Sequence, residues 1–178
     1  MANARELKSD WLRGGKSSFP IPLGASVVIG TATGGLQTGK FVTAASTGAI
    51  HSVAGSTMLT GWVEVGPWDY TNGAAHPHFL SNGTALATVV NCIRDLTAVF
   101  RMPLLYTALL ANWSAAETGL YSDLVASTAG LQMADLTTAT RNVLIGVGGL
   151  AATAVNTSAT LGDGYVDVMM NPATSIGV

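Results

Sequence analysis

The sequence predicts a mainly β protein: small β-barrel or sandwich lobes preceded by a short N-terminal helical arm. Short runs rich in β-branched and apolar residues alternate with glycine-rich turns, which is typical of such folds. Residues 96–104 alternate with a period of two and give one wholly apolar face, as expected for a half-buried strand. Apart from the first residues, we expect little helix.

The arm is predicted at residues 3–14. Asn3 and Glu6 have the spacing of a capping box, and Leu7 and Trp11 fall on one helical face. Two glycines at 14–15 would end the helix. Residues 17–23 contain two prolines, which favour extended backbone, and we expect a linker there. Residues 1–23 are therefore assigned to an arm and its linker.

The first β lobe is predicted at residues 24–66. Short strands are expected at 25–29, 41–45, 49–54 and 58–65, separated by glycine-containing turns. Residues 67–82 hold two prolines and an Asn-Gly pair, and they are predicted to be the loop that connects two lobes.

The second β lobe is predicted at residues 83–178. Strands are expected at 86–93, 96–104, 142–147 and 165–170. In the last of these, Tyr165, Asp167 and Met169 would share one face and the intervening residues the other. Residues 104–116 could form a short helix or turn, and the pattern at 117–136 does not decide between structures.

The composition indicates a surface that is covered by other protein. The chain has 178 residues, of which 10% are charged and 48% hydrophobic, with 26 Ala, 21 Gly and 21 Thr. Typical globular proteins carry about 25% charged residues, which keep their surfaces soluble. We therefore expect a homo-oligomer, a homotrimer formed by the β body. The most apolar run, 143–155, includes three glycines and is shorter than the roughly 20 residues of a membrane span.

Charge is distributed unevenly along the chain. Residues 1–40 carry five basic and two acidic side chains, whereas residues 41–178 carry three basic and eight acidic ones. A basic end on an acidic body is typical of a contact arm, although a solvated tail has the same pattern. We predict that the arm binds a protein partner, with Leu7 and Trp11 docking and four basic residues meeting acidic groups; the predicted partner-binding residues are Arg5, Leu7, Lys8, Trp11, Arg13 and Lys16.

One string resembles a phosphate-binding loop. Residues 34–40 match the spacing G-x-x-x-x-G-K, but Phe41 replaces the Ser or Thr that would bind magnesium. The residues that follow favour a strand, so no helix N-terminus is expected to receive a phosphate. We interpret the string as a hairpin turn. The acidic body and the few basic residues of the arm also argue against nucleic-acid binding.

No catalytic or metal site is predicted. His76 and His78 flank a proline, and a zinc site would need a third ligand, which His51 or Asp69 could supply only if the fold brought them near. Cys92 lies in an apolar run and is expected to be a buried, inert thiol. With no cysteine pair and no G-x-S-x-G elbow, we expect neither cofactor nor enzyme activity.

Two carboxylates and three aromatic residues leave alternatives open. Asp163 and Asp167 flank a predicted turn, and the sequence does not favour an acid/base pair there over two solvated carboxylates. Trp62, Trp68 and Tyr70 surround a Gly-Pro corner. They could form a carbohydrate platform or close the end of a β lobe, and we favour the second interpretation.

The chain resembles the head decoration, or cement, proteins of tailed bacteriophages. The similarity lies in composition and in the punctuation of strands by glycine, and no invariant motif carries it. It covers about residues 20–173, through the stretches PLGASVVIGTATGGLQTGKFVTAASTGAIHSVAG, GWVEVG, VFRMPLLYTA, ETGLYSDLVASTAGLQ and GYVDVMMNPA.

The resemblance implies a β-rich structural virion protein, made in the host cytoplasm, that binds the major capsid protein on the capsid exterior and bridges coat subunits. This chain is longer than the small lambda-type stabilisers, so extra strands or a second lobe must account for the difference. Alternatives are another virion protein, such as a coat or tail-tube subunit, and a carbohydrate-binding β module.

Overall fold

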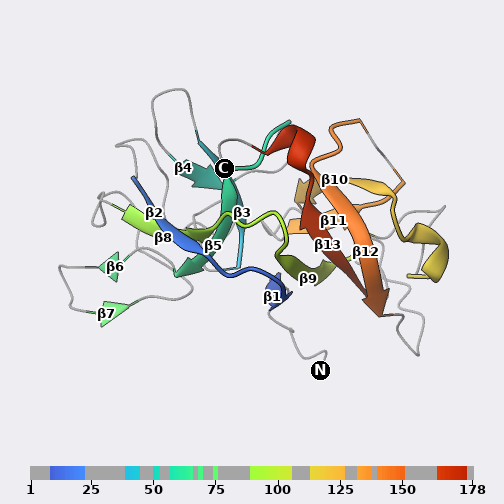
Figure 1. Cartoon of the computed structure of the whole chain (residues 1–178), viewed down its shortest axis with the longest axis horizontal. Coiled ribbons are helices and arrows are strands. Elements are labelled where there is room, and N and C mark those ends of the chain that lie inside the picture. The colour runs from blue at the N-terminus through green and yellow to red at the C-terminus, as the bar shows by residue number, and fades with distance from the viewer. Residues whose placement is uncertain are drawn as a thin grey trace.

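The structure is a computed structural model that confirms the predicted β class (Figure 1). It describes residues 9–22, 39–44, 50–52, 57–65, 68–69, 74–75, 89–105, 113–126, 132–137, 140–150 and 164–175. The strands form a six-stranded sheet, a five-stranded sheet and a two-stranded pair, in which every pair of neighbouring strands is antiparallel. No helix in the described part of the chain is long and apolar enough to cross a membrane.

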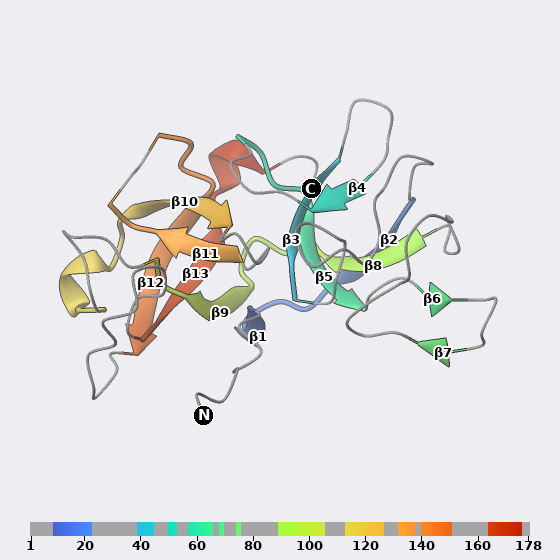
Figure 2. The ribbon, with the colours of Figure 1, turned by 180° about the vertical axis from the view of Figure 1, so that it is seen from behind.

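The six-stranded sheet has the order β1-β9-β13-β12-β10-β11. Its strands are β1 (Asp10–Arg13), β9 (Val99–Pro103), β13 (Tyr165–Met170), β12 (Leu144–Leu150), β10 (Tyr121–Ala126) and β11 (Gln132–Asp135). Figure 2 shows β10 and β11 side by side. An isolated parallel bridge joins Leu104 to Ala134, but the described strands form no closed barrel, so that part of the predicted fold is wrong.

The five-stranded sheet has the order β2-β8-β5-β3-β4. Its strands are β2 (Ser18–Pro22), β8 (Val89–Ile93), β5 (Gly61–Val65), β3 (Phe41–Ala44) and β4 (Ile50–Ser52). The predicted connecting loop contains the two-stranded pair β6 (Trp68–Asp69) and β7 (Ala74–Ala75). Strand β8, which we assigned to the second lobe, lies between β2 and β5 in this sheet. The chain therefore passes from the five-stranded to the six-stranded sheet between β8 and β9, whereas β1, which precedes β2, also belongs to the six-stranded sheet.

The predicted N-terminal helix is not seen in the described residues 9–14, which include a strand instead, so this part of the prediction is wrong. Trp11 and its neighbours lie in β1, where Asp10 pairs with Arg101 and Trp11 with Phe100. Because β9 supplies hydrogen-bond partners from a distant part of the chain, the backbone is satisfied as a strand rather than as a helix. Residues 1–8, which include the predicted cap, lie outside the described residues.

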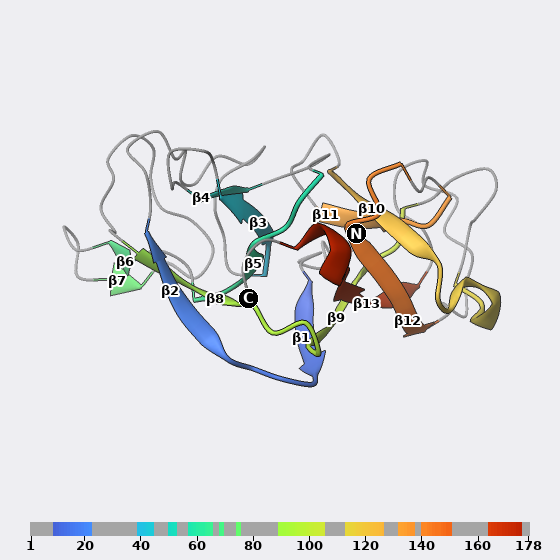
Figure 3. The same cartoon turned by 45° about the horizontal axis from the view of Figure 1, so that its top comes forward.

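Residues 10–22 form one ribbon with residues 89–103 that runs through both sheets (Figure 3). Between β1 and β2 the chain passes beside the turn that joins β8 to β9. In that turn Asp95 Oδ1 accepts hydrogen bonds from the backbone N and from Oγ1 of Thr97, and these bonds lower the pKa of Asp95. Gly14 has a φ of +92°, and a Cβ there would lie 2.0 Å from the Thr97 carbonyl oxygen. The close crossing therefore requires glycine at this position.

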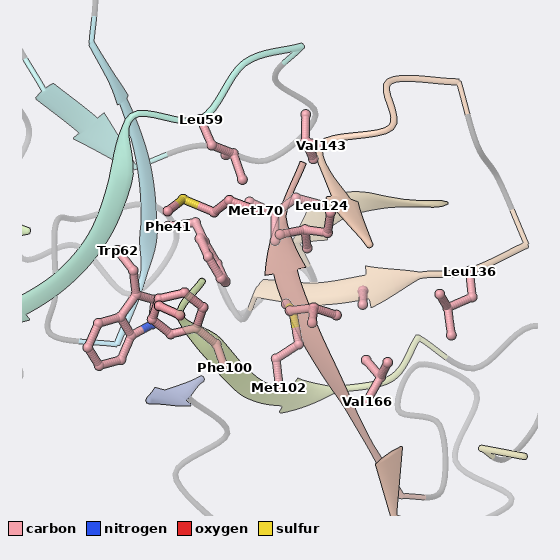
Figure 4. Packing of buried hydrophobic residues seen from close by; sticks show 14 of the residues in the cluster. Phe41, Leu59, Trp62, Phe100, Met102, Leu124, Leu136, Val143, Val166 and Met170 are labelled. Atoms are coloured by element: carbon pink, nitrogen blue, oxygen red, sulfur yellow. The ribbon is translucent and has the colours of Figure 1, made fainter. Parts of the chain in front are cut away.

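The two sheets share one hydrophobic core (Figure 4). Phe100 of the six-stranded sheet meets Phe41 and Trp62 of the five-stranded sheet, with ring centroids 5.2 and 5.1 Å apart. The predicted apolar face of 96–104 is confirmed: four of its residues are fully buried and Leu96 packs against them. The predicted alternation of residues 165–170 between two faces is confirmed too, since Val166, Val168 and Met170 lie in the core.

Two short 3₁₀ helices occur in the described residues: Ala115–Glu117, at the end of the predicted helix or turn, and Pro172–Thr174. Ser114 caps the first, and its backbone N donates to Glu117 Oε2 over 2.7 Å. Beside this helix the Trp113 ring packs on β12, where a Cβ on Gly149 would lie 2.2 Å from the ring. Trp113 thus closes one end of the core.

Candidate binding surface

Of the N-terminal residues that we predicted to bind a partner, Trp11 and Lys16 contact their own chain. Trp11 is half-buried and packs against the core, and the Lys16 ammonium lies 5.2 Å from the centroid of its ring. Lys16 Nζ also lies 2.8 Å from Glu64 Oε1, and this hydrogen bond is the main cause that lowers the pKa of Glu64. Arg13 is exposed. Arg5, Leu7 and Lys8 lie outside the described residues.

A larger candidate surface is the side of the six-stranded sheet that faces away from the core. We call it the outer face. Residues that are Cα partners on neighbouring antiparallel strands project to the same side of a sheet. The register places these residues in rows across the outer face: Tyr121–Ile145–Met169, then Asp10–Arg101–Asp167–Gly148, then Leu150–Tyr165–Pro103.

Several large apolar or aromatic residues of the outer face are at least partly exposed. Tyr121 is 48% exposed and Leu150 54% exposed, and Ile145, Tyr165 and Met169 are partly exposed. The outer side of an antiparallel sheet is usually polar when water covers it. Exposed apolar residues that gather on one face can mark an interaction site in soluble proteins.

Asp10, Arg101 and Asp167 lie side by side in the middle row of the outer face. Arg101 donates to both oxygens of the Asp167 carboxylate, from Nε over 2.8 Å and from Nη2 over 3.0 Å. The Asp167 side chain is 9% exposed and that of Arg101 33% exposed. The bond to Asp167 raises the pKa of Arg101. Asp167 is thus a buried, paired carboxylate and not the solvated group that the sequence left open; Asp163 lies outside the described residues.

The phosphate-loop string continues into a strand, as we predicted. Gly39 has a φ of +83° and its N donates to Val63 O over 2.9 Å, and β3 begins directly after Lys40. Lys40 is buried, and this burial lowers its pKa. A phosphate therefore has neither a helix N-terminus nor an exposed lysine at this turn.

Cys92 is buried in β8, as predicted. It is fully covered, and burial raises the pKa of its thiol to about 12. A thiol with such a pKa contributes almost no thiolate near neutral pH, so it is a poor nucleophile.

In the part of the chain that the structure describes, no three His, Cys, Asp or Glu side chains gather as metal ligands. Of the residues that we considered for a metal site, His51 lies in β4 and Asp69 in β6, and His76 and His78 lie outside the described residues.

Trp62 belongs to the core and cannot form part of an exposed carbohydrate platform. It is 5% exposed, and its Nε1 donates to Ser9 Oγ over 2.7 Å. Ser9 Oγ in turn donates to the Gly39 carbonyl oxygen. This chain of bonds fixes the N-terminal segment to the five-stranded sheet. Of the other two aromatic residues, Trp68 lies in β6 and Tyr70 outside the described residues.

Comparisons with protein-family models, with curated proteins and with solved structures found no match for this chain.

The sequence predicted one face of residues 165–170 but not its neighbours on other strands. The strand register places Arg101, Tyr121 and Leu150 on that face.

Proposed function

We propose that the protein is a structural virion protein that binds the outer surface of a tailed-phage capsid and stabilises it by bridging coat subunits. The observation that carries this proposal is the apolar outer face of the six-stranded sheet. Its exposed residues include Tyr121 and Leu150, and its one described ion pair is internally compensated. The resemblance of the sequence to cement proteins agrees with such a surface.

The physical mechanism is stabilisation by selective binding. A protein that binds the assembled, expanded shell and not its free subunits lowers the free energy of the shell relative to its alternatives. A contact across a joint between coat subunits must cover apolar area on more than one subunit. The two apolar rows of the outer face suit that task, because covering them desolvates no charge.

The N-terminal segment has a smaller part in this proposal than the sequence suggested. Trp11 and Lys16 already contact their own chain, so they have less surface to offer to a coat protein. Arg5, Leu7, Lys8 and Arg13 remain proposed contacts of the arm. The β body is proposed to assemble as a homotrimer on the capsid exterior, without cofactor, nucleic acid, membrane or enzymatic activity.

The test is co-sedimentation of the purified protein with empty expanded capsids, assembled from the major coat protein of the same virus. We expect saturable binding and a higher melting temperature of the decorated shell. Binding to glycans on an array, with none to capsids, would favour the carbohydrate module instead. Polymerisation of the chain into tubes or shells by itself would favour a tail-tube or coat subunit.

A further inference from the structure

Residues 9–22, which we call the strap, supply an edge strand to each of the two large sheets (Figure 3). Strand β1 is the first in the order of the six-stranded sheet, and β2 is the first in the order of the five-stranded sheet. In the described residues, β1 pairs with β9 alone and β2 with β8 alone. The other strands of both sheets would therefore keep their pairing to one another if the strap detached.

Both strands of the strap are attached to one continuous stretch of the chain, residues 89–103. Between β1 and β2 the attachment continues, because Gly15 N donates to Thr97 Oγ1 over 3.1 Å and Arg94 N donates to Ser17 O over 3.4 Å. Contacts thus follow the strap from one strand to the next without a break. We therefore expect its two strands to detach together.

A buried serine holds the strap at its first residue. Ser9 is 1% exposed, and its Oγ accepts a hydrogen bond from Trp62 Nε1 over 2.7 Å and donates to the Gly39 carbonyl oxygen. The Lys16–Glu64 ion pair, in contrast, is open to water and contributes little. Since a buried donor that loses its partner is costly, the bonds of Ser9 are the stronger polar attachment of the two.

The remainder of the strap is packed less completely than the strand on which it lies. Three of the four residues of β1 are exposed, whereas four of the five residues of β9 are buried. Leu12 and Phe19 of the strap are 37% and 49% exposed. The indole N–H of Trp11 is buried and has no hydrogen-bond partner among the described residues, which disfavours the attached state. Segments with few buried apolar contacts are those that open within a protein that otherwise stays folded.

We infer that the strap opens and closes as one unit over a body that stays folded, and that Ser9 holds it closed. In the closed state it covers the edges of β8 and β9, which follow each other along residues 89–103. In the open state these edges present unpaired N–H and C=O groups, to which an extended segment of another molecule can pair. The strap therefore controls access to the edges of both sheets.

The experiment is native-state hydrogen exchange of the full chain at low urea concentrations. The variant Ser9→Ala leaves Trp62 Nε1 unpaired only while the strap is closed. It should therefore speed the exchange of the amides of β1 and of β2 by one common factor, of about ten. The matched control is Ser114→Ala, the same substitution at the exposed cap of the first 3₁₀ helix, which should leave the exchange of the strap unchanged.

A second variant tests whether the strap opens separately from the body. Val143 is fully buried and lies across the core from Trp62 (Figure 4). Val143→Ala weakens the body equally whether the strap is open or closed. The amides of β13 should therefore exchange about tenfold faster in this variant, while those of the strap stay within about twofold of wild type. In wild type, the amides of the strap should share one urea dependence that is shallower than that of β13, because opening the strap exposes less surface than unfolding the chain.

Four results would overturn the inference. Equal acceleration of the strap and β13 in Val143→Ala would show that the strap detaches only when the whole chain unfolds. The same urea dependence for the strap and β13 in wild type would show this without any variant. Faster exchange of β1 alone in Ser9→Ala would show that the two strands detach separately. Exchange of the strap that slows as protein concentration rises would show that a second copy holds it closed.

Discussion

Replacing Gly14 by alanine tests whether the crossing of the N-terminal ribbon holds both sheets. Gly14 has a φ of +92°, and an added Cβ would lie 2.0 Å from the Thr97 carbonyl oxygen. A left-handed conformation costs a residue other than glycine about 1–2 kcal/mol. Overpacking against backbone, which cannot rotate away, costs about 1–3 kcal/mol more. We therefore expect Gly14→Ala to lose about 2–5 kcal/mol of unfolding free energy, or about 4–20 °C in melting temperature for a chain of this size.

A second glycine provides the control. Gly119 has a φ of +89°, and no atom of the described residues lies within 4 Å of an added Cβ. Gly119→Ala therefore keeps the backbone strain and omits the clash, and we expect a loss of about 1–2 kcal/mol. Thermal unfolding followed by circular dichroism measures both variants, and hydrogen exchange reports the amides of β1. Equal losses for the two variants would refute the argument, since the contact with Thr97 would then contribute nothing.

Three further results are expected. Arg101→Met leaves the Asp167 carboxylate buried without its partner and should cost about 2 kcal/mol in chemical unfolding, with part of the loss recovered when Asp167→Asn is added; equal stability of the single and double variants would contradict this. Because Lys16 lowers the pKa of Glu64 below its ordinary 4.5, this ion pair stabilises the folded chain above that pH, and its contribution disappears as the pH falls through the folded pKa. Urea unfolding should accordingly separate Glu64→Gln from wild type at pH 7, by less than about 1 kcal/mol for so exposed a pair, and should not separate them near pH 3. Cys92 should resist a thiol-reactive dye at pH 8 until the chain is unfolded; rapid labelling of the folded protein would show that the thiol is accessible.

The strands that could be predicted are those with sustained alternation. Residues 165–170 were predicted with both faces, and β13 has the same bounds, because six alternating residues leave no competing periodicity. The apolar face that includes Phe100 and Met102 was found for the same reason. In both segments the information is local.

The features that escaped prediction depend on distant partners. Leu7 and Trp11 have helical spacing, but the pairing of Trp11 with Phe100 determines the strand, and a local pattern does not contain it. The outer face likewise exists only through register, which brings Leu150 beside Tyr165 and Tyr121 beside Ile145.

Strand β2 is an edge strand of the five-stranded sheet in the part of the chain that the structure describes. Its two prolines affect how the protein behaves at high local concentration. Antiparallel pairs alternate between hydrogen-bonded and non-hydrogen-bonded positions. Arg94 N donates to Ser17 O, so Pro20 and Pro22, which face Asn91 and Val89, fall at non-hydrogen-bonded positions. Their nitrogens therefore point toward the open edge, where they have no hydrogen to donate. A strand from a neighbouring molecule finds an incomplete ladder there. Copies that are crowded side by side are thereby discouraged from joining into a continuous intermolecular sheet, the route by which exposed β edges nucleate aggregates.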